Sequence, residues 1–302
     1  LAAASSVTLG SATLTTTPAA ATTFSGVISG SGGLVTAGIN TVTLTGANTY
    51  TGGTTVSAGS PLRGSTAGIQ GNITNSGQVE FNQGTNGTYA GIISGTGDVA
   101  KTGTGAVTLS ANNTYTGSTN LSNGSLFVNG SISNSTITVQ TGTVLGGDGT
   151  VGVILVTGGT VAPGLSPAIL NSGTVTFDAA STFTVELDGA TVGTGYDQLN
   201  VTGTVTLGDA TLTVLPGFTA PAGTTFIIIS NDLADAISGT FAGLAEGATV
   251  TAGGQTFQIS YVGGDGNDVV LSVAAAVPSL PFAGFLALAA LLAGLGYLRL
   301  RA

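Results

Sequence analysis

The 302-residue sequence contains no cysteine, histidine, methionine or tryptophan, and only 6% of its residues are charged. Without cysteine the chain has no disulfide framework and no thiolate metal site. Without histidine it lacks the side chain that most often serves as general base or metal ligand, and no Ser-His-Asp triad can form within it. We therefore expect a protein that is not an enzyme, with no catalytic residues and no cofactor.

Basic residues are the second deficit, with four Lys and Arg against thirteen Asp and Glu and a net charge of −9. Before Val277 the only basic residues are Arg63 and Lys101, which excludes the basic stripe that nucleic acids require. Ten of the thirteen acids lie between Asp178 and Asp268. We interpret them as charges that only keep the protein soluble; loose attraction of divalent cations is the alternative.

The sequence is rich in glycine, with 51 residues. Many short segments alternate apolar residues with threonine. Val42-Thr43-Leu44, Val107-Thr108-Leu109 and Val205-Thr206-Leu207 show the period-2 pattern of half-buried β-strands. Asn-Gly dipeptides such as Asn123-Gly124 are turn signals, because both residues tolerate positive φ. The pattern predicts an all-β protein.

A segment of 37 residues, Phe24 to Ser60, recurs without a gap 65 positions later as Tyr89 to Ser125, with 18 identities. Self-similarity at a fixed period is typical of chains that stack one unit on the next. The sequence therefore predicts a right-handed parallel β-solenoid, with the 65-residue repeat divided into three coils of roughly 21 residues. An antiparallel sandwich is the alternative, because it also combines short strands with Gly-rich turns.

The most similar stretch of the repeat is Asn48 to Gly52 against Asn113 to Gly117, both reading NTYTG. Stacking predicts equivalent corners for the two copies. Tyr50 and Tyr115 are expected to pack turns rather than to bind sugars.

With these motifs in view, the two copies resemble the autotransporter-associated β-strand repeat of bacterial passenger domains. Gly158 to Pro167, reading GGTVAPGLSP, is similar to the GGTxxPGxSP coil of those passengers, and Tyr196 to Val201 and Gly239 to Leu271 resemble their last part. The resemblance implies an exported protein of the bacterial cell surface or extracellular matrix. Such passengers include adhesins, structural stalks and occasionally enzymes.

The C-terminal segment, residues 282–302, reads as a hydrophobic α-helix with a basic end, after a Pro-containing linker at 276–281. This part resembles the PEP-CTERM-like sorting segments recognised by exosortases, which implies at least transient membrane attachment and a sorting protease. The residues predicted to form the membrane or assembly helix are Phe282, Phe285, Leu288, Leu292, Leu295, Arg299 and Arg301.

Two acidic motifs carry possible chemistry. Gly263 to Leu271 fits one calcium nonapeptide, GGxGxDxUx, which makes Asp265, Asn267 and Asp268 candidate Ca²⁺ ligands; a Gly-rich turn explains the same residues. Glu186 and Asp188 lie two apart on a predicted strand and resemble a glycosidase carboxylate pair. Phe183, Val185 and Leu187 claim the inward face of that strand, so both acids are expected in solvent.

The sequence thus predicts an N-terminal cap or first coil (1–23), two solenoid repeats (24–150), acidic solenoid coils (151–275), the linker and the helix. We expect a structural, secreted protein that self-assembles as a homo-oligomer or homopolymer into a fibre, surface layer or matrix. A monomeric adhesin displayed through its sorting segment is the alternative, and a polysaccharide-acting β-helix enzyme is a more remote one.

Overall fold

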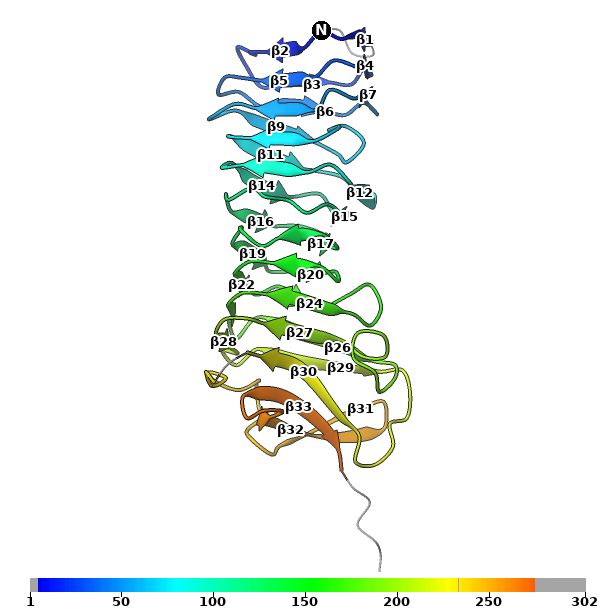
Figure 1. Ribbon diagram of the computed structural model, residues 1–302, viewed down its shortest axis with the longest axis vertical. Helices are drawn as coiled ribbons and strands as arrows, with labels where there is room; N and C mark the ends of the chain where they lie inside the picture. Colours follow the sequence, from blue (N-terminus) through cyan, green and yellow to red (C-terminus); the bar gives the residue numbers. More distant parts are fainter. Residues whose placement is uncertain (1–4, 233, 275–302) are drawn as a thin grey trace, which may run out of the picture.

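The computed structural model describes residues 5–232 and 234–274, which form a rod of stacked β-coils (Figure 1). Within these residues there is no α-helix, and every strand pairing before the C-terminal end is parallel. The predicted parallel β-solenoid is confirmed. The coils have three faces, because each turn of the chain adds one strand to each of three stacks.

We number the faces by the strands that begin them: β1 (Val7–Thr8) begins the first face, β2 (Leu14–Thr16) the second and β3 (Thr22–Phe24) the third. The third face is a single sheet of ten strands that runs along the rod. Its strands are β3 (Thr22–Phe24), β6 (Val42–Leu44), β9 (Pro61–Gly64), β11 (Gln78–Phe81), β14 (Asp98–Lys101), β16 (Thr119–Leu121), β19 (Ile137–Gln140), β22 (Ile154–Thr157), β25 (Val175–Phe177) and β28 (Val205–Thr206).

The first face consists of a three-stranded and a seven-stranded sheet, joined by an irregular stretch at 65–70. The stack is continuous there, because the Asn48 amide donates to the Ala67 carbonyl and the Gln70 amide donates to the Tyr50 hydroxyl. The strands are β1 (Val7–Thr8), β4 (Ile28–Gly30), β7 (Thr49–Tyr50), β12 (Gly87–Tyr89), β15 (Ala106–Leu109), β17 (Ser125–Val128), β20 (Val144–Gly146), β23 (Thr160–Val161), β26 (Thr182–Leu187) and β29 (Thr211–Pro216).

The second face likewise consists of two sheets, bridged at 112–116 where the Thr114 amide donates to the Ile93 carbonyl and the Asn113 amide donates to the Ser131 carbonyl. The strands are β2 (Leu14–Thr16), β5 (Leu34–Thr36), β8 (Thr54–Val56), β10 (Ile73–Asn75), β13 (Ile93–Gly95), β18 (Ser131–Ile132), β21 (Thr150–Val151), β24 (Ile169–Ser172), β27 (Gln198–Val201), β30 (Thr225–Asn231), β33 (Asp268–Val273), β32 (Gln255–Gly263) and β31 (Thr249–Ala252).

The 65-residue repeat does not equal three coils, as its length had suggested. Paired residues in the first coils are about 20 positions apart, for example Leu34 with Thr54. The repeat therefore covers three coils and one further side. Each strand of the second copy therefore lies one face further on than its counterpart in the first copy. β4 lies on the first face and its counterpart β13 on the second. In the same way β5 and β14 lie on the second and third faces, and β6 and β15 on the third and first.

The two NTYTG copies consequently make the same local contacts on different faces. Asn48 Oδ1 accepts a hydrogen bond from the Ile28 amide at 2.7 Å, and Asn113 Oδ1 accepts one from the Ile93 amide at 2.9 Å. Tyr50 and Tyr115 are both fully buried, and their hydroxyls contact Thr54 and Thr119. The prediction that these tyrosines pack turns is confirmed, but the two corners lie one face apart.

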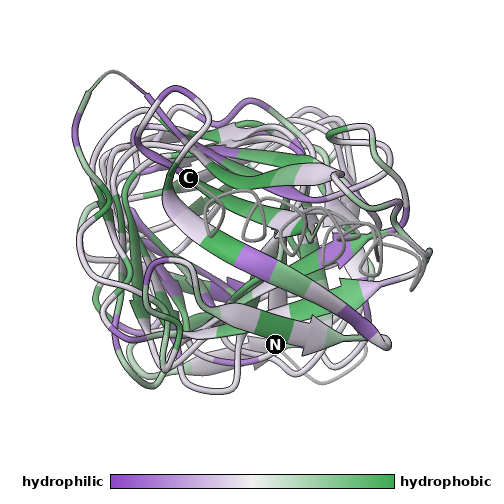
Figure 2. Cartoon of the chain, turned by 90° about the horizontal axis from the view of Figure 1, so that it is seen from below, coloured by the Kyte–Doolittle hydropathy of each residue, from purple (hydrophilic) through white to green (hydrophobic). Residues whose placement is uncertain are grey.

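The core runs the length of the rod and follows the period-2 pattern. In most strands apolar residues point inward and polar residues point outward, as in β6, where Val42 and Leu44 are buried and Thr43 is not. Some polar strand residues, such as Thr36 and Asn75, are buried as well. A view along the rod shows apolar strand residues around the interior and paler connecting turns outside (Figure 2). A basic side chain also enters this core. Lys101 is 1% exposed, and burial lowers the pKa of its ammonium, which donates to the carbonyls of Gly103 and Asn123.

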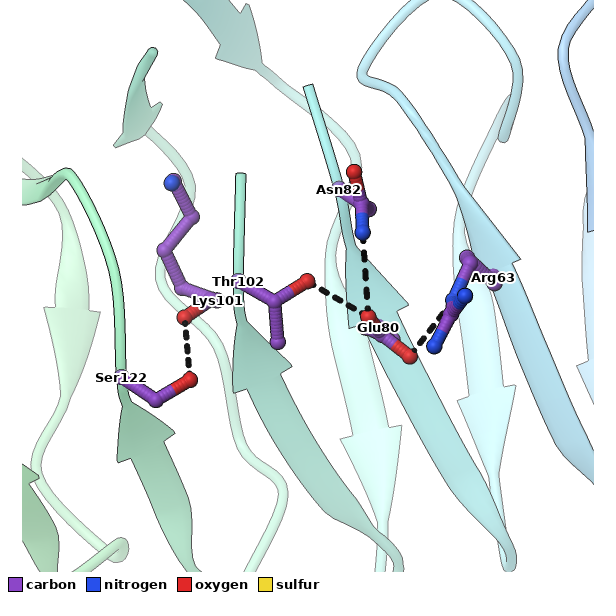
Figure 3. Close-up of polar contacts among 6 residues, drawn as sticks. All are labelled: Arg63, Glu80, Asn82, Lys101, Thr102 and Ser122. Atoms are coloured by element: carbon purple, nitrogen blue, oxygen red, sulfur yellow. Dashed lines mark hydrogen bonds and ion pairs between the residues drawn. The ribbon is translucent and has the colours of Figure 1, made fainter. Parts of the chain in front are cut away.

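Polar side chains on the outer surface of the third face pair from coil to coil (Figure 3). Arg63 Nε lies 2.8 Å from Glu80 Oε2, and Asn82 and Thr102 donate to the other oxygen of that carboxylate. Burial raises the pKa of Glu80, but these hydrogen bonds and the Arg63 charge outweigh it, so the pKa is lowered. In the same view the Lys101 ammonium points away from this cluster.

The C-terminal end of the rod is closed by antiparallel strands. β33 pairs with β30, and β32 pairs with β33 and β31, all antiparallel. The segment 151–275, expected to be solenoid coils throughout, therefore consists of coils followed by this cap. The predicted hydrophobic helix at 282–302 lies outside the described residues, and among those described no helix is long and apolar enough to cross a membrane.

Candidate ligand-binding groove

Two loops leave the outline of the coil where the turns of the rod lengthen (Figure 1). Residues 162–168 connect β23 to β24, and residues 188–197 connect β26 to β27. Gly164 and Gly193 have φ values of +81° and +77°, which glycine adopts without strain. The coil length rises accordingly, from 16 residues between Val144 and its partner Thr160 to 30 between Val175 and its partner Val205.

A groove of about 700 Å³ lies between these loops on the second face. Its floor consists of outward side chains of β24 and β27, and its rim includes Leu165, 71% exposed, and Val192. The amide and carboxylate side chains that line it are Asn129, Asp148, Asn171, Gln198 and Asn200, beside the hydroxyl residues Ser166 and Thr194. The groove is therefore rich in amides, and only one of these side chains carries a charge.

The amides of the floor are held in place by coil-to-coil hydrogen bonds. Asn200 Nδ2 donates to Asn171 Oδ1 at 2.9 Å, and Asn171 Nδ2 donates to the Gly149 carbonyl at 3.2 Å. Gln198 Nε2 donates to the Ile227 carbonyl at 2.8 Å. Such side chains keep one orientation, and their remaining donors and acceptors are available to a ligand.

Asp197 fastens the two loops beneath the groove. Its Oδ1 accepts from the Ala168 amide at 2.9 Å and its Oδ2 from the Glu186 amide at 2.8 Å. The side chain is 1% exposed, and burial raises its pKa to about 7, although both hydrogen bonds act in the opposite direction.

The predicted carboxylate pair lies beside the groove, not in it. Phe183, Val185 and Leu187 are fully buried, as predicted, while Glu186 is half-buried and Asp188 is exposed. Both acids border a shallow depression formed with residues 214–217. The depression lacks the depth and the aromatic wall that a sugar-cleaving site needs.

The candidate calcium ligands Asp265 and Asn267 lie in the turn that joins β32 to β33, and Asp268 is the first residue of β33. Asn267 and Asp268 are 5% exposed, whereas Asp265 is exposed. No three carboxylates of the described residues converge closely enough to hold a metal without further ligands. The candidate helix residues Phe282 to Arg301 lie outside the described part of the chain.

Sequence reasoning missed the groove and Asp197. The groove depends on residues from coils up to about 70 positions apart, which no local pattern connects. Asp197 carried a weak signal, because this acid follows a glycine-rich segment and directly precedes the alternating run Gln198 to Val201, which forms β27.

The repeat matches a known family. Residues 34–60 and 99–127 match the passenger-associated-transport-repeat, and these two segments are again 65 positions apart. The chain thus carries two copies of an autotransporter-associated repeat, which confirms that part of the resemblance; the sorting-segment resemblance remains a prediction.

Two curated proteins are similar to part of the chain. The adhesin BmaC autotransporter of Brucella suis biovar 1 (strain 1330) is 40% identical over 113 residues, which are 35% of this chain and 3% of that protein. The extracellular serine protease of Serratia marcescens is 38% identical over 101 residues, 33% of this chain and 10% of that protein. The chain spans a small fraction of the length of either relative. Both relatives point to a secreted or cell-surface protein.

Proposed function

We propose that this protein is a surface-displayed, non-enzymatic adhesive stalk that binds a neutral polysaccharide through the amide-lined groove. The observation that carries the proposal is the groove itself, built by two loops on an otherwise regular rod. Rigid β-scaffolds commonly bear their binding residues on such loops. Similarity to an adhesin supports the same role.

The chemistry of the groove favours hydroxyl-rich, uncharged ligands. Amides both donate and accept hydrogen bonds, as sugar hydroxyls do. Anionic ligands are disfavoured, because Asp148 lines the groove and no Lys or Arg occurs between residues 102 and 298. Aromatic stacking contributes nothing in this groove, since Tyr196, the tyrosine nearest in sequence, is buried.

A proteolytic role has little support. The protease relative is matched over 10% of its length, and the 302 residues of this chain contain no histidine to activate a serine.

The test is binding of the full chain to a panel of immobilised neutral and anionic polysaccharides. The variant Asn171→Ala/Asn200→Ala should lower affinity for a bound neutral polysaccharide by tenfold or more, because two buried polar contacts are lost. The matched control is Asn120→Ala/Gln140→Ala, which removes a hydrogen-bonded amide pair from the third face. Equal loss in both variants, or binding of anionic polysaccharides alone, would contradict the proposal.

Self-assembly into a fibre is a second candidate, favoured by the N-terminal end of the rod. Among the described strands, none covers the outer edges of β1, β2 and β3. A small apolar hollow lined by Val7, Leu14 and Phe24 opens at that end. Unpaired edges can be extended by another strand.

The second candidate is tested by light scattering and electron microscopy of the purified chain. Thr15→Pro removes an edge donor from β2 and should dissolve any assembly formed through this end. An assembly that survives the substitution, or a chain that is monomeric at all concentrations, argues against it.

A further inference from the structure

The polar cluster inside the cap is formed where the segment after β30 meets the β32–β33 turn. The Asn231 amide donates to Asp268 Oδ1 at 2.9 Å. Asn231 Nδ2 and Asn267 Nδ2 both donate to the Asp235 carbonyl, at 2.6 and 3.1 Å, and Asn267 Nδ2 also donates to the Asp232 carbonyl at 3.2 Å. The two asparagines therefore approach one short segment, one from the end of β30 and the other from the β32–β33 turn.

Two oxygen atoms of this cluster are buried without a hydrogen-bond donor. They are Oδ1 of Asn231, a residue that is 3% exposed, and Oδ1 of Asp232. A buried acceptor without a partner costs about 1–3 kcal/mol, so such atoms are rare in folded proteins unless a water or an ion completes them. Two in consecutive residues indicate a missing ligand that accepts electron pairs.

The charge of the cluster indicates that this ligand is a cation. Asp268 Oδ1 and the buried Asp232 Oδ1 bring two acidic side chains to this end of the cap, Asp265 lies in the same turn, and no Lys or Arg occurs between residues 102 and 298. A water molecule satisfies lone pairs but does not neutralise these carboxylates.

We propose that the cap binds one Ca²⁺ ion through Oδ1 of Asn231, Oδ1 of Asp232 and the carboxylate of Asp268. Ca²⁺ accepts carboxylate and amide oxygens in flexible geometry, with main-chain carbonyls and water completing six to eight ligands. This site differs from the one that the nonapeptide pattern predicts: the exposed Asp265 contributes charge, and the decisive oxygens come from β30 and the residue that follows it. The ion joins the last parallel strand to the antiparallel cap.

Asp232→Asn is the decisive variant. Asp232 Oδ1 makes no hydrogen bond, so the substitution leaves the protein without calcium as stable as before, yet it removes a charged ligand. Saturating Ca²⁺ should raise the melting temperature of the full chain by about 3–8 °C over chelator, and this shift should disappear in Asp232→Asn. Titration calorimetry should give a stoichiometry near one for the unmodified chain.

Asp209→Asn is the matched control. Asp209 is exposed, lies outside the cluster and has a φ of 60°, which asparagine tolerates. It removes the same charge and should keep the full calcium response. Absence of both heat and a melting shift in the unmodified chain, an unchanged response in Asp232→Asn, or equal loss in Asp209→Asn would each overturn the proposed site.

Discussion

The N-terminal two thirds of the rod and its C-terminal third are built on the same three faces but differ in coil length. From β2 to β23 each coil takes 16 to 20 residues, and almost all of them lie in strands and tight corners. From β24 onward a coil takes 29 to 30 residues. The added residues form loops and longer strands, such as the six residues of β26 and the seven of β30. The comparison teaches that regular coils supply length, whereas lengthened coils supply surfaces that can bind.

The interiors of the two regions differ as well. Among the described residues, six of the seven close aromatic pairs lie in the C-terminal region, between Phe177 and Tyr261. The exception is the pair Phe81 and Tyr89. Both regions bury aliphatic and aromatic side chains, but close ring-to-ring packing is concentrated in the C-terminal region. The core of that region therefore depends more on contacts between large rings.

The largest expected effect comes from Phe226→Ala. Phe226 is fully buried, with ring centroids of Tyr196, Phe218 and Phe257 at 5.2, 6.2 and 6.2 Å. Truncation should lower the free energy of unfolding by about 3–5 kcal/mol. Urea denaturation measures it, with Val107→Ala in the shaft as the comparison at about 1–3 kcal/mol. A larger loss in the shaft would show that the two regions do not divide the core energy in this way.

Asp197 should make the stability of the C-terminal region depend on pH. Its pKa is raised to about 7, so the native state holds the proton more tightly than the unfolded state does. The stabilisation is complete below about pH 4 and is lost as pH rises through about 7, by at most about 4 kcal/mol. We expect the difference in unfolding free energy between the unmodified chain and Asp197→Asn to fall over this range. A difference that is constant from pH 4 to 8 would refute the assignment.

Asn48→Ala and Asn113→Ala test whether the two repeats are energetically equal on different faces. Each substitution removes a buried amide that accepts from an isoleucine amide and donates to a carbonyl, of Gly68 or of Ser131. Each should cost about 1–3 kcal/mol. The two losses, measured by thermal or urea unfolding, should agree to within about 0.5 kcal/mol. A clear difference between the two losses would mean that the face on which the motif lies, and not the motif itself, determines how much it contributes to the free energy of unfolding.

Arg63→Ala should have the smallest effect. Its guanidinium is 46% exposed, and its ion pair with Glu80 should contribute less than about 1 kcal/mol and weaken with salt. The pKa of Glu80 is lowered, so the stabilisation from this carboxylate is present above about pH 4.3 and is lost as pH falls below it. Unfolding at low and high salt, at pH 7 and pH 3, separates these two contributions.

Local patterns predicted the strands well, because alternation in segments such as Val42-Thr43-Leu44 directly encodes an inward and an outward face. They did not predict the coil length. The 65-residue period is the distance between two copies of the sequence, and this distance is not a whole number of turns of the chain. The antiparallel cap and the contact between Asn231 and Asp268 could not be predicted from the sequence either. These residues are 37 positions apart, and only the folded cap brings them together.

The offset between repeat and coil decides how such a rod looks from outside. Each copy of the repeat shows its surface residues one third of a revolution away from the previous copy, so three copies return the pattern to its starting side. A shaft lengthened by further copies would therefore present the same surface residues on all three faces in turn. A ligand would meet equivalent surfaces on every side of the shaft. Only the lengthened coils have one distinct side, which the two loops form.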